Sequence, residues 1–154
     1  MSTILVVDDE ALARDALAKL LEHEGFTALR AGNGRDAWAM MYHHRPDLIL
    51  LDLMMPEMDG VTFLSMVRRD PLWRGLPVVL LTAADDHDNL ITRAWDLGVS
   101  DLLPKATFEV AEVVARVRHH LAHPAPPAPR PAAGAAGPRA ARRSPQLGRL
   151  VAAG

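Results

Sequence analysis

The chain has 154 residues, 49% hydrophobic and 23% charged, which is enough for one globular domain with a substantial core. It contains no cysteine, which excludes disulfides, thiolate metal sites and cysteine nucleophiles and fits a reducing compartment. No segment approaches the roughly 18 apolar residues of a transmembrane helix, and the N-terminus lacks the basic flank of a signal peptide. We therefore expect a cytoplasmic protein that is not in a membrane.

The formal net charge of −2 conceals an uneven distribution of charge along the chain. Residues 1–121 contain all 19 acidic side chains, whereas residues 122–154 contain five arginines and no acid. Pro, Ala and Gly make up 22 of these last 33 residues, a composition that buries too little apolar surface to offset chain entropy. We predict a folded acidic domain over residues 1–121 and a disordered basic tail over 122–154. Arginines without aromatic residues bind nucleic acid weakly, so we expect no specific DNA binding by the tail.

Hydrophobic periodicity predicts five strands that alternate with five helices. The strands are short aliphatic runs: residues 3–7, 26–30, 48–52, 77–82 and 100–103. Helical spacing predicts inward-facing residues in the intervening segments: Leu12, Ala13, Ala16, Leu17, Leu20, Leu21, Trp38, Met41, Tyr42, Leu64, Val67, Leu90, Ile91, Ala94, Trp95, Val110, Val113, Val114, Val117 and Leu121. Alternation of this kind is typical of an α/β fold in which helices cover both faces of a parallel sheet.

Polar residues follow several of these predicted strands. Asp8 and Asp9 follow the first strand, Asp52 and Thr82 end the third and fourth, and Lys105 comes just after the fifth. Because the carboxyl ends of parallel strands share one edge of a sheet, we expect these side chains to converge. Three adjacent carboxylates repel one another, so at least one should be difficult to ionise without a bound cation. Oxygen ligands without histidine or cysteine favour Mg²⁺, and lysine and threonine suit a phosphoryl group carried on a carboxylate.

These residues resemble the motifs of the receiver domain of two-component response regulators, and the resemblance covers residues 2–121. The motifs are Asp8-Asp9, the segment DLMMPEMDG that begins with Asp52, LLTA with Thr82, and GVSDLLPK with Lys105. The resemblance implies a flavodoxin-like (βα)5 fold, a doubly wound parallel sheet with strand order 2-1-3-4-5. It also implies a signalling phosphoacceptor that catalyses only its own phosphorylation and dephosphorylation, with no DNA-binding or enzymatic output domain in this chain.

The resemblance assigns a role to each residue at the carboxyl edge of the sheet. Asp52 would accept a phosphoryl group from a sensor histidine kinase or a phosphotransfer protein, Lys105 would pair with that group, and Thr82 would turn inward to hydrogen-bond it. Mg²⁺ would be held by these groups: Asp9, Asp52, the main-chain carbonyl of Met54 and, through water, Asp8. The surface of the fourth helix, fifth strand and fifth helix would then change, and it could bind a downstream protein or a second copy of the chain.

The sequence departs from the family pattern near these residues. Ala106 stands where the family usually has a proline in a cis bond, which leaves the isomer of the Lys105–Ala106 bond open. Leu102 replaces an aromatic residue that often swings with the threonine, so the usual aromatic switch cannot operate. The positions two residues after the phosphoacceptor and after the threonine tune dephosphorylation in the family. Here they are Met54 and Ala84, which cannot hold an attacking water by a side-chain hydrogen bond, and we therefore predict slow self-dephosphorylation.

Two other functions remain open at this stage. One is an Mg²⁺-dependent phosphohydrolase with an aspartate nucleophile, but Met54 occupies the position where such enzymes usually carry a second aspartate, and there is no room for a cap domain. The other is a degenerate receiver that takes no phosphate and only binds proteins, which Leu102 and Ala106 leave open.

Three histidines near the end of the last predicted helix have partly metal-like spacing. His119 and His123 are four residues apart, but we interpret them, with His120, as polar or cationic groups near a helix C-terminus. The G-N-G segment at residues 32–34 lacks the third glycine of a nucleotide-binding loop, and we interpret it as a turn.

Overall fold

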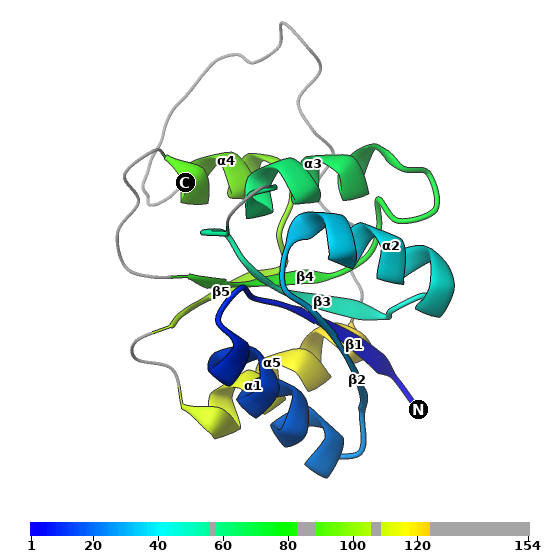
Figure 1. The fold of residues 1–154 in the computed structure, drawn as a ribbon, viewed down its shortest axis with the longest axis vertical. Helices are drawn as coiled ribbons and strands as arrows, with labels where there is room; N and C mark the ends of the chain where they lie inside the picture. Colours follow the sequence, from blue (N-terminus) through cyan, green and yellow to red (C-terminus); the bar gives the residue numbers. More distant parts are fainter. Residues whose placement is uncertain (56–57, 83–88, 106–108, 124–154) are drawn as a thin grey trace, which may run out of the picture.

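The computed structural model describes residues 1–55, 58–82, 89–105 and 109–123, in which five strands alternate with five helices (Figure 1). The strands are β1 (Thr3–Val7), β2 (Thr27–Ala31), β3 (Leu48–Asp52), β4 (Val78–Thr82) and β5 (Asp101–Pro104). The helices are α1 (Ala11–His23), α2 (Gly34–His44), α3 (Gly60–Arg69), α4 (Leu90–Asp96) and α5 (Val110–Ala122). The predicted strand boundaries agree with these bounds to within one residue.

The five strands form one sheet in which every neighbouring pair is parallel. The strand order is β2-β1-β3-β4-β5, which confirms the flavodoxin-like topology. Helices α2, α3 and α4 cover one face of the sheet, and α1 and α5 cover the other (Figure 1). All carboxyl ends of the strands therefore lie along one edge, and the helices exclude water from both faces beneath it.

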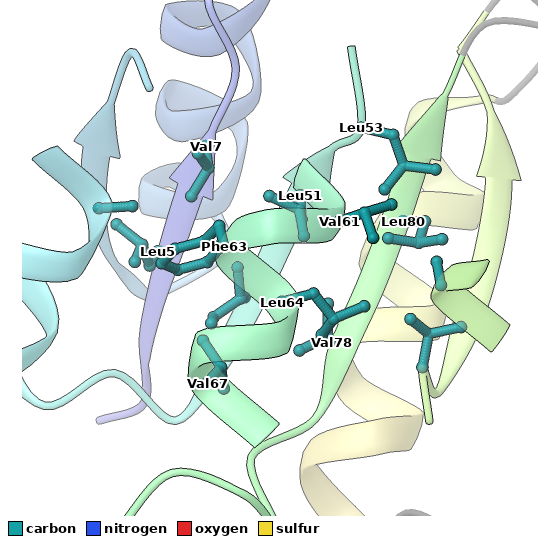
Figure 2. Packing of buried hydrophobic residues seen from close by; sticks show 14 of the residues in the cluster. Leu5, Val7, Leu51, Leu53, Val61, Phe63, Leu64, Val67, Val78 and Leu80 are labelled. Atoms are coloured by element: carbon teal, nitrogen blue, oxygen red, sulfur yellow. The ribbon is translucent and has the colours of Figure 1, made fainter. Parts of the chain in front are cut away.

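Each face of the sheet has its own hydrophobic cluster. β3 and β4 are buried along their whole length, as expected for central parallel strands covered on both faces. Figure 2 shows that Phe63, Leu64 and Val67 of α3 pack against the strands, and Phe63 has no solvent exposure. This packing holds the end of β3 in a fixed position.

Five predicted inward residues face solvent instead: Leu12, Ala16, Tyr42, Trp95 and Val110. Leu12 is 88% exposed because the buried residues of α1 lie further along the helix, at Leu17, Ala18 and Leu21. Val110, at the first position of α5, is also exposed. Trp95 is 48% exposed because α4 buries only the adjacent Ala94, and neighbouring helical positions point about 100° apart.

Local turns agree with the sequence signals that predicted them. Gly25 and Gly98 both have positive φ, which favours glycine, and they follow α1 and α4. Asn33, the middle residue of the G-N-G segment, caps α2, since its side chain accepts a hydrogen bond from the Asp36 amide at 2.8 Å. The sequence predicts a turn for this segment, and the structure shows that it leads from β2 into the first residue of α2, Gly34.

Within the described part of the chain, every helix is too short or too polar to cross a membrane. The predictions for Ala84, for the Lys105–Ala106 bond and for the tail beyond residue 123 fall outside the described residues.

Candidate functional site

The carboxyl edge of the sheet brings together the three aspartates that the sequence singled out. Asp8 and Asp9 lie just beyond β1, and Asp52 is the last residue of the adjacent strand β3. One carboxylate oxygen from each lies within 4.8 Å of the others. Asp8 and Asp52 are buried, with 1% and 4% exposure, whereas Asp9 is exposed at the rim.

Lys105 reaches into this acidic group from the end of β5. Its Nζ lies 2.9 Å from Asp8 Oδ2 and 3.4 Å from Asp52 Oδ2. The main chain anchors the lysine, because the Lys105 amide donates to the Thr82 carbonyl at 2.7 Å. Burial lowers the pKa of Lys105, but its hydrogen bonds and charge contacts with the acids outweigh burial and hold the pKa above its usual value. Lys105 is thus a permanent cation at this site.

The ionisation of Asp52 is suppressed in this environment. Its pKa is raised to about 6, mainly by burial and also by the charge of Asp8, while the Met54 amide and Lys105 act in the opposite direction. The sequence led us to expect one carboxylate that is difficult to ionise, and Asp52 is that group. However, burial contributes more than the repulsion between carboxylates that the expectation rested on.

The loop after Asp52 is shaped by close backbone contacts. The Met54 amide donates to Asp52 Oδ1 at 3.1 Å, and the Met54 side chain is about half exposed. At Gly60 a Cβ atom would come within 2.7 Å of the Asp52 carbonyl oxygen, so only glycine fits there. Asp59 caps α3 by accepting from the Thr62 amide at 2.8 Å, which fixes the return of the chain.

Thr82 lies on β4, the strand beside that of Asp52, and Leu102 lies one strand further, on β5. Thr82 ends β4 and is 3% exposed, so the structure places it at the same edge as the acids. Leu102 is partly buried and packs against the hydrophobic cluster under α3 and α4. Ala84, the remaining tuning position, is not among the described residues.

The acidic group fits a hard divalent cation. Its potential ligands are carboxylate oxygens, which are those that Mg²⁺ prefers. Asp8 Oδ2 is buried and receives no well-oriented hydrogen bond from the described residues, although Lys105 Nζ lies nearby. A buried carboxylate oxygen in this condition is costly, and a cation would satisfy it.

Sequence reasoning missed Glu10, which also contacts Lys105. Glu10 Oε1 lies 2.7 Å from Lys105 Nζ, nearer than either aspartate. The signal in the sequence was a third consecutive acid after the first strand. It could not be distinguished from the acidic first turn of an ordinary helix.

The histidines at the end of α5 do not join the site. His120 Nε2 lies 2.9 Å from Asp101 Oδ2, and the rings of His119 and His123 stack with centroids 4.8 Å apart. Among the described residues, the group of Asp8, Asp9 and Asp52 is the one set of three or more potential metal ligands that converge.

The fold and this pocket together define a class of protein: an α/β domain with an acidic, lysine-containing pocket at the carboxyl edge of a parallel sheet. The chain belongs to the response regulator receiver domain family, which matches residues 4–118. It is therefore a receiver domain of the kind found in two-component response regulators.

Named relatives agree with this assignment. The chain is 39% identical over 124 residues to the phosphate regulon transcriptional regulatory protein PhoB of Pseudomonas aeruginosa, covering 80% of this chain and 53% of PhoB. It is 40% identical over 118 residues to the DNA-binding response regulator MtrA of Mycobacterium tuberculosis, covering 77% of this chain and 50% of MtrA. The chain thus spans about half the length of the curated relatives it matches.

A solved structure gives the same result. The signal receiver domain of a signal transduction histidine kinase from Syntrophus aciditrophicus superposes with a TM-score of 0.73 at 31% sequence identity. The superposition covers 79% of this chain and 91% of the other.

Proposed function

We propose that this chain is a phosphorylation-controlled switch in which Asp52 accepts a phosphoryl group from a histidine kinase or phosphotransfer protein. The observation that carries the proposal is the position of the Asp52 carboxylate. It is buried at the carboxyl end of a fully buried strand, with Lys105 Nζ 3.4 Å away and two further carboxylates beside it. A reactive acid held next to a fixed cation is suited to nucleophilic attack on phosphorus.

In the proposed reaction, a carboxylate oxygen of Asp52 attacks the phosphorus of a phosphohistidine. The new O–P bond forms as the N–P bond breaks, and the leaving imidazole takes up a proton. With its pKa near 6, Asp52 is mostly the nucleophilic carboxylate at neutral pH. Lys105 would then pair with the phosphoryl oxygens, and the hydroxyl of Thr82 would hydrogen-bond to them.

Mg²⁺ is the metal we propose for the site, held by the side chains of Asp8, Asp9 and Asp52 and the main-chain carbonyl of Met54. When bound, the cation supplies positive charge against the carboxylates and the phosphoryl oxygens. Without the cation, the charge of Lys105 and the backbone amides of Glu10 and Met54 stabilise the carboxylates of Asp8 and Asp52.

The output is proposed to be a change in the surface formed by α4, β5 and α5, which would bind a downstream protein or a second copy of the chain. Leu102 is a partly buried residue of β5 and so belongs to one of the elements of this surface. Relatives such as MtrA are named as DNA-binding regulators, and the chain spans about half their length. The absence of specific DNA binding therefore stays a prediction, as do the cytoplasmic location and the disordered tail.

The phosphoryl adduct itself tests the proposal. After incubation with Mg²⁺ and a small phosphodonor, intact-mass spectrometry should show a stable gain of about 80 Da that Asp52→Ala abolishes. Rapid turnover of a phosphoester without an adduct would indicate the hydrolase instead. No change in mass would indicate a receiver that only binds proteins.

The lifetime of the adduct tests the two tuning positions. Because Met54 and Ala84 offer no side-chain hydrogen bond to an attacking water, the adduct should persist well beyond seconds once excess chelator stops further phosphorylation. Decay within seconds would show that another group positions the water.

A further inference from the structure

Glu10 occupies the N-cap position of α1 but does not cap the helix. Its side chain makes no capping hydrogen bond and instead reaches Lys105, 95 residues away in sequence. Its Oε1 lies 2.7 Å from Lys105 Nζ. The side chain of an N-cap residue ordinarily accepts a hydrogen bond from a free amide in the first turn of the helix. Glu10 contacts Lys105 instead of stabilising the start of α1 in this way.

Three carboxylates surround the one ammonium group. Lys105 Nζ lies 2.7 Å from Glu10, 2.9 Å from Asp8 and 3.4 Å from Asp52. Glu10 and Asp52 accept hydrogen bonds from this ammonium group, whereas Asp8 Oδ2 receives none that is well oriented. When Asp52 carries a phosphoryl group, the phosphoryl oxygens take the place of its carboxylate beside Lys105, and Glu10 remains as a competing acceptor.

The three carboxylates differ in how easily they can leave. The Glu10 side chain is 66% exposed, whereas those of Asp8 and Asp52 are 1% and 5% exposed. Phosphorylation turns the Asp52 carboxylate into an uncharged acyl group, so Asp52 gives up its ion pair, but releasing Asp8 would leave a buried charge without its partner, which is costly. Glu10 is instead hydrated on release, and exposed ion pairs contribute little stability.

We propose that Glu10 is a positioning residue that competes with the phosphoryl group for Lys105. This inference rests on the proposed phosphoacceptor function of Asp52. Before phosphorylation, Glu10 holds the ammonium group at the rim of the pocket. Phosphorylation moves that ammonium group onto the phosphoryl oxygens and frees Glu10. Glu10 therefore limits how readily the pocket accepts a phosphoryl group.

The test compares the affinity of the Mg²⁺-saturated protein for beryllofluoride, a mimic of the phosphoryl group, by isothermal titration calorimetry. Glu10→Gln should lower the dissociation constant about two- to fivefold, the size expected when an exposed ion pair no longer competes. The matched control is Glu22→Gln on the same helix, which removes one charge and breaks an exposed pair with Arg30 at 3.2 Å. This control should bind as the wild type does.

A second variant separates competition for Lys105 from simple repulsion of an incoming anion. Glu10→Asp keeps the charge but shortens the side chain by one methylene, so it should lose contact with Lys105 and bind as tightly as Glu10→Gln. Urea midpoints equal to that of the wild type would show that the change in affinity does not come from altered folding.

Three results would overturn the inference: a Glu10→Gln protein that binds beryllofluoride no better than the wild type, one that binds it more weakly, or a Glu10→Asp protein that behaves as the wild type. If the wild type binds beryllofluoride but the variants match it, only the role of Glu10 fails. If the wild type itself does not bind, the proposed function of Asp52 fails as well.

Discussion

At the amino edge of the sheet the partly buried cation Arg68 is surrounded by backbone carbonyls, whereas at the carboxyl edge Lys105 is surrounded by carboxylates. Arg68, near the end of α3, makes five hydrogen bonds of 2.7–3.2 Å. The acceptors are the carbonyl oxygens of Arg74, Leu76, Leu97 and Gly98. These carbonyls precede β4 and β5, so one side chain joins the chain segments that enter two neighbouring strands.

The difference concerns whether the partners can be exchanged. Burial lowers the pKa of Arg68 to about 10, and the guanidinium still remains charged at neutral pH. Its carbonyl partners belong to the main chain and cannot leave without local unfolding. At the carboxyl edge the partners are side chains, one aspartate has a raised pKa, and one buried oxygen lacks a well-oriented hydrogen bond. The amino edge is thus built for rigidity and the carboxyl edge for ligand exchange.

The largest effect on stability should come from removing the hydrogen bonds of Arg68 at the amino edge of the sheet. Arg68→Met removes five hydrogen bonds and leaves mostly partly buried carbonyls without these donors, so it should lower the free energy of unfolding by about 3 kcal/mol. Urea denaturation measures the loss. The matched control is Arg69→Met, because Arg69 is exposed and, among the described residues, bonds only within its own helix, to Ser65. Equal stability of the two variants would show that the carbonyl cluster does not depend on Arg68.

Removing the negative charge of Asp52 at the carboxyl edge should raise the free energy of unfolding, whereas Arg68→Met lowers it. The folded protein holds the Asp52 proton more tightly than the unfolded chain, since the pKa rises from 3.8 to about 6. Ionisation of Asp52 therefore lowers the free energy of unfolding. The loss is absent below about pH 4, grows between about pH 4 and 6, and is complete at higher pH. In excess chelator, Asp52→Asn should raise the free energy of unfolding by about 2 kcal/mol at pH 7.5 and by much less at pH 4.5.

Asp96→Asn serves as the control for this measurement, because Asp96 is exposed at the end of α4 and its substitution should change stability by less than about 0.5 kcal/mol. A destabilised Asp52→Asn protein in chelator would mean that the acidic pocket stabilises the fold, and the contrast between the two edges would disappear.

The smallest effect should come from Asp101, a partly buried aspartate of β5 that pairs with Arg116 and His120 of α5. Burial raises its pKa, but hydrogen bonds from Arg116 and His120 outweigh burial, so the pKa lies below its ordinary value. Ionised Asp101 therefore stabilises the folded protein. This stabilisation is complete above the ordinary aspartate pKa and is lost as the pH falls through the lowered pKa of Asp101. Asp101→Asn should lower the thermal midpoint by about 2–4 °C at pH 7, and this difference should shrink as the pH falls through the lowered pKa of Asp101. An undiminished difference at low pH would show that the effect is not electrostatic.

The sequence predicted the sheet and its carboxyl edge because both depend on local patterns. Aliphatic runs ending in Asp8, Asp52 and Thr82 place polar groups at strand ends in any parallel sheet, whatever the details of packing. Strand order followed from the resemblance to the family. Neither required knowledge of a particular side-chain contact.

The contacts of Glu10 and Arg68 could not be predicted, since both join segments that are distant in sequence and both depend on side-chain rotamers. Likewise, helical spacing defines a face but not how far along the helix that face is covered. Leu12 and Val110 therefore appeared to belong to the core, although each lies in the first turn of its helix and is exposed.

A two-step NMR titration of the ¹⁵N-labelled protein, with Mg²⁺ and then beryllofluoride, tests most directly the claim that ligand exchange occurs at the carboxyl edge. We predict saturable shifts at the amides of Asp9, Asp52, Met54 and Lys105, while the amides of Leu97 and Gly98 and the Nε–H of Arg68 stay unchanged. Saturation without any change at the carboxyl edge, or changes of equal size at both edges, would contradict the account.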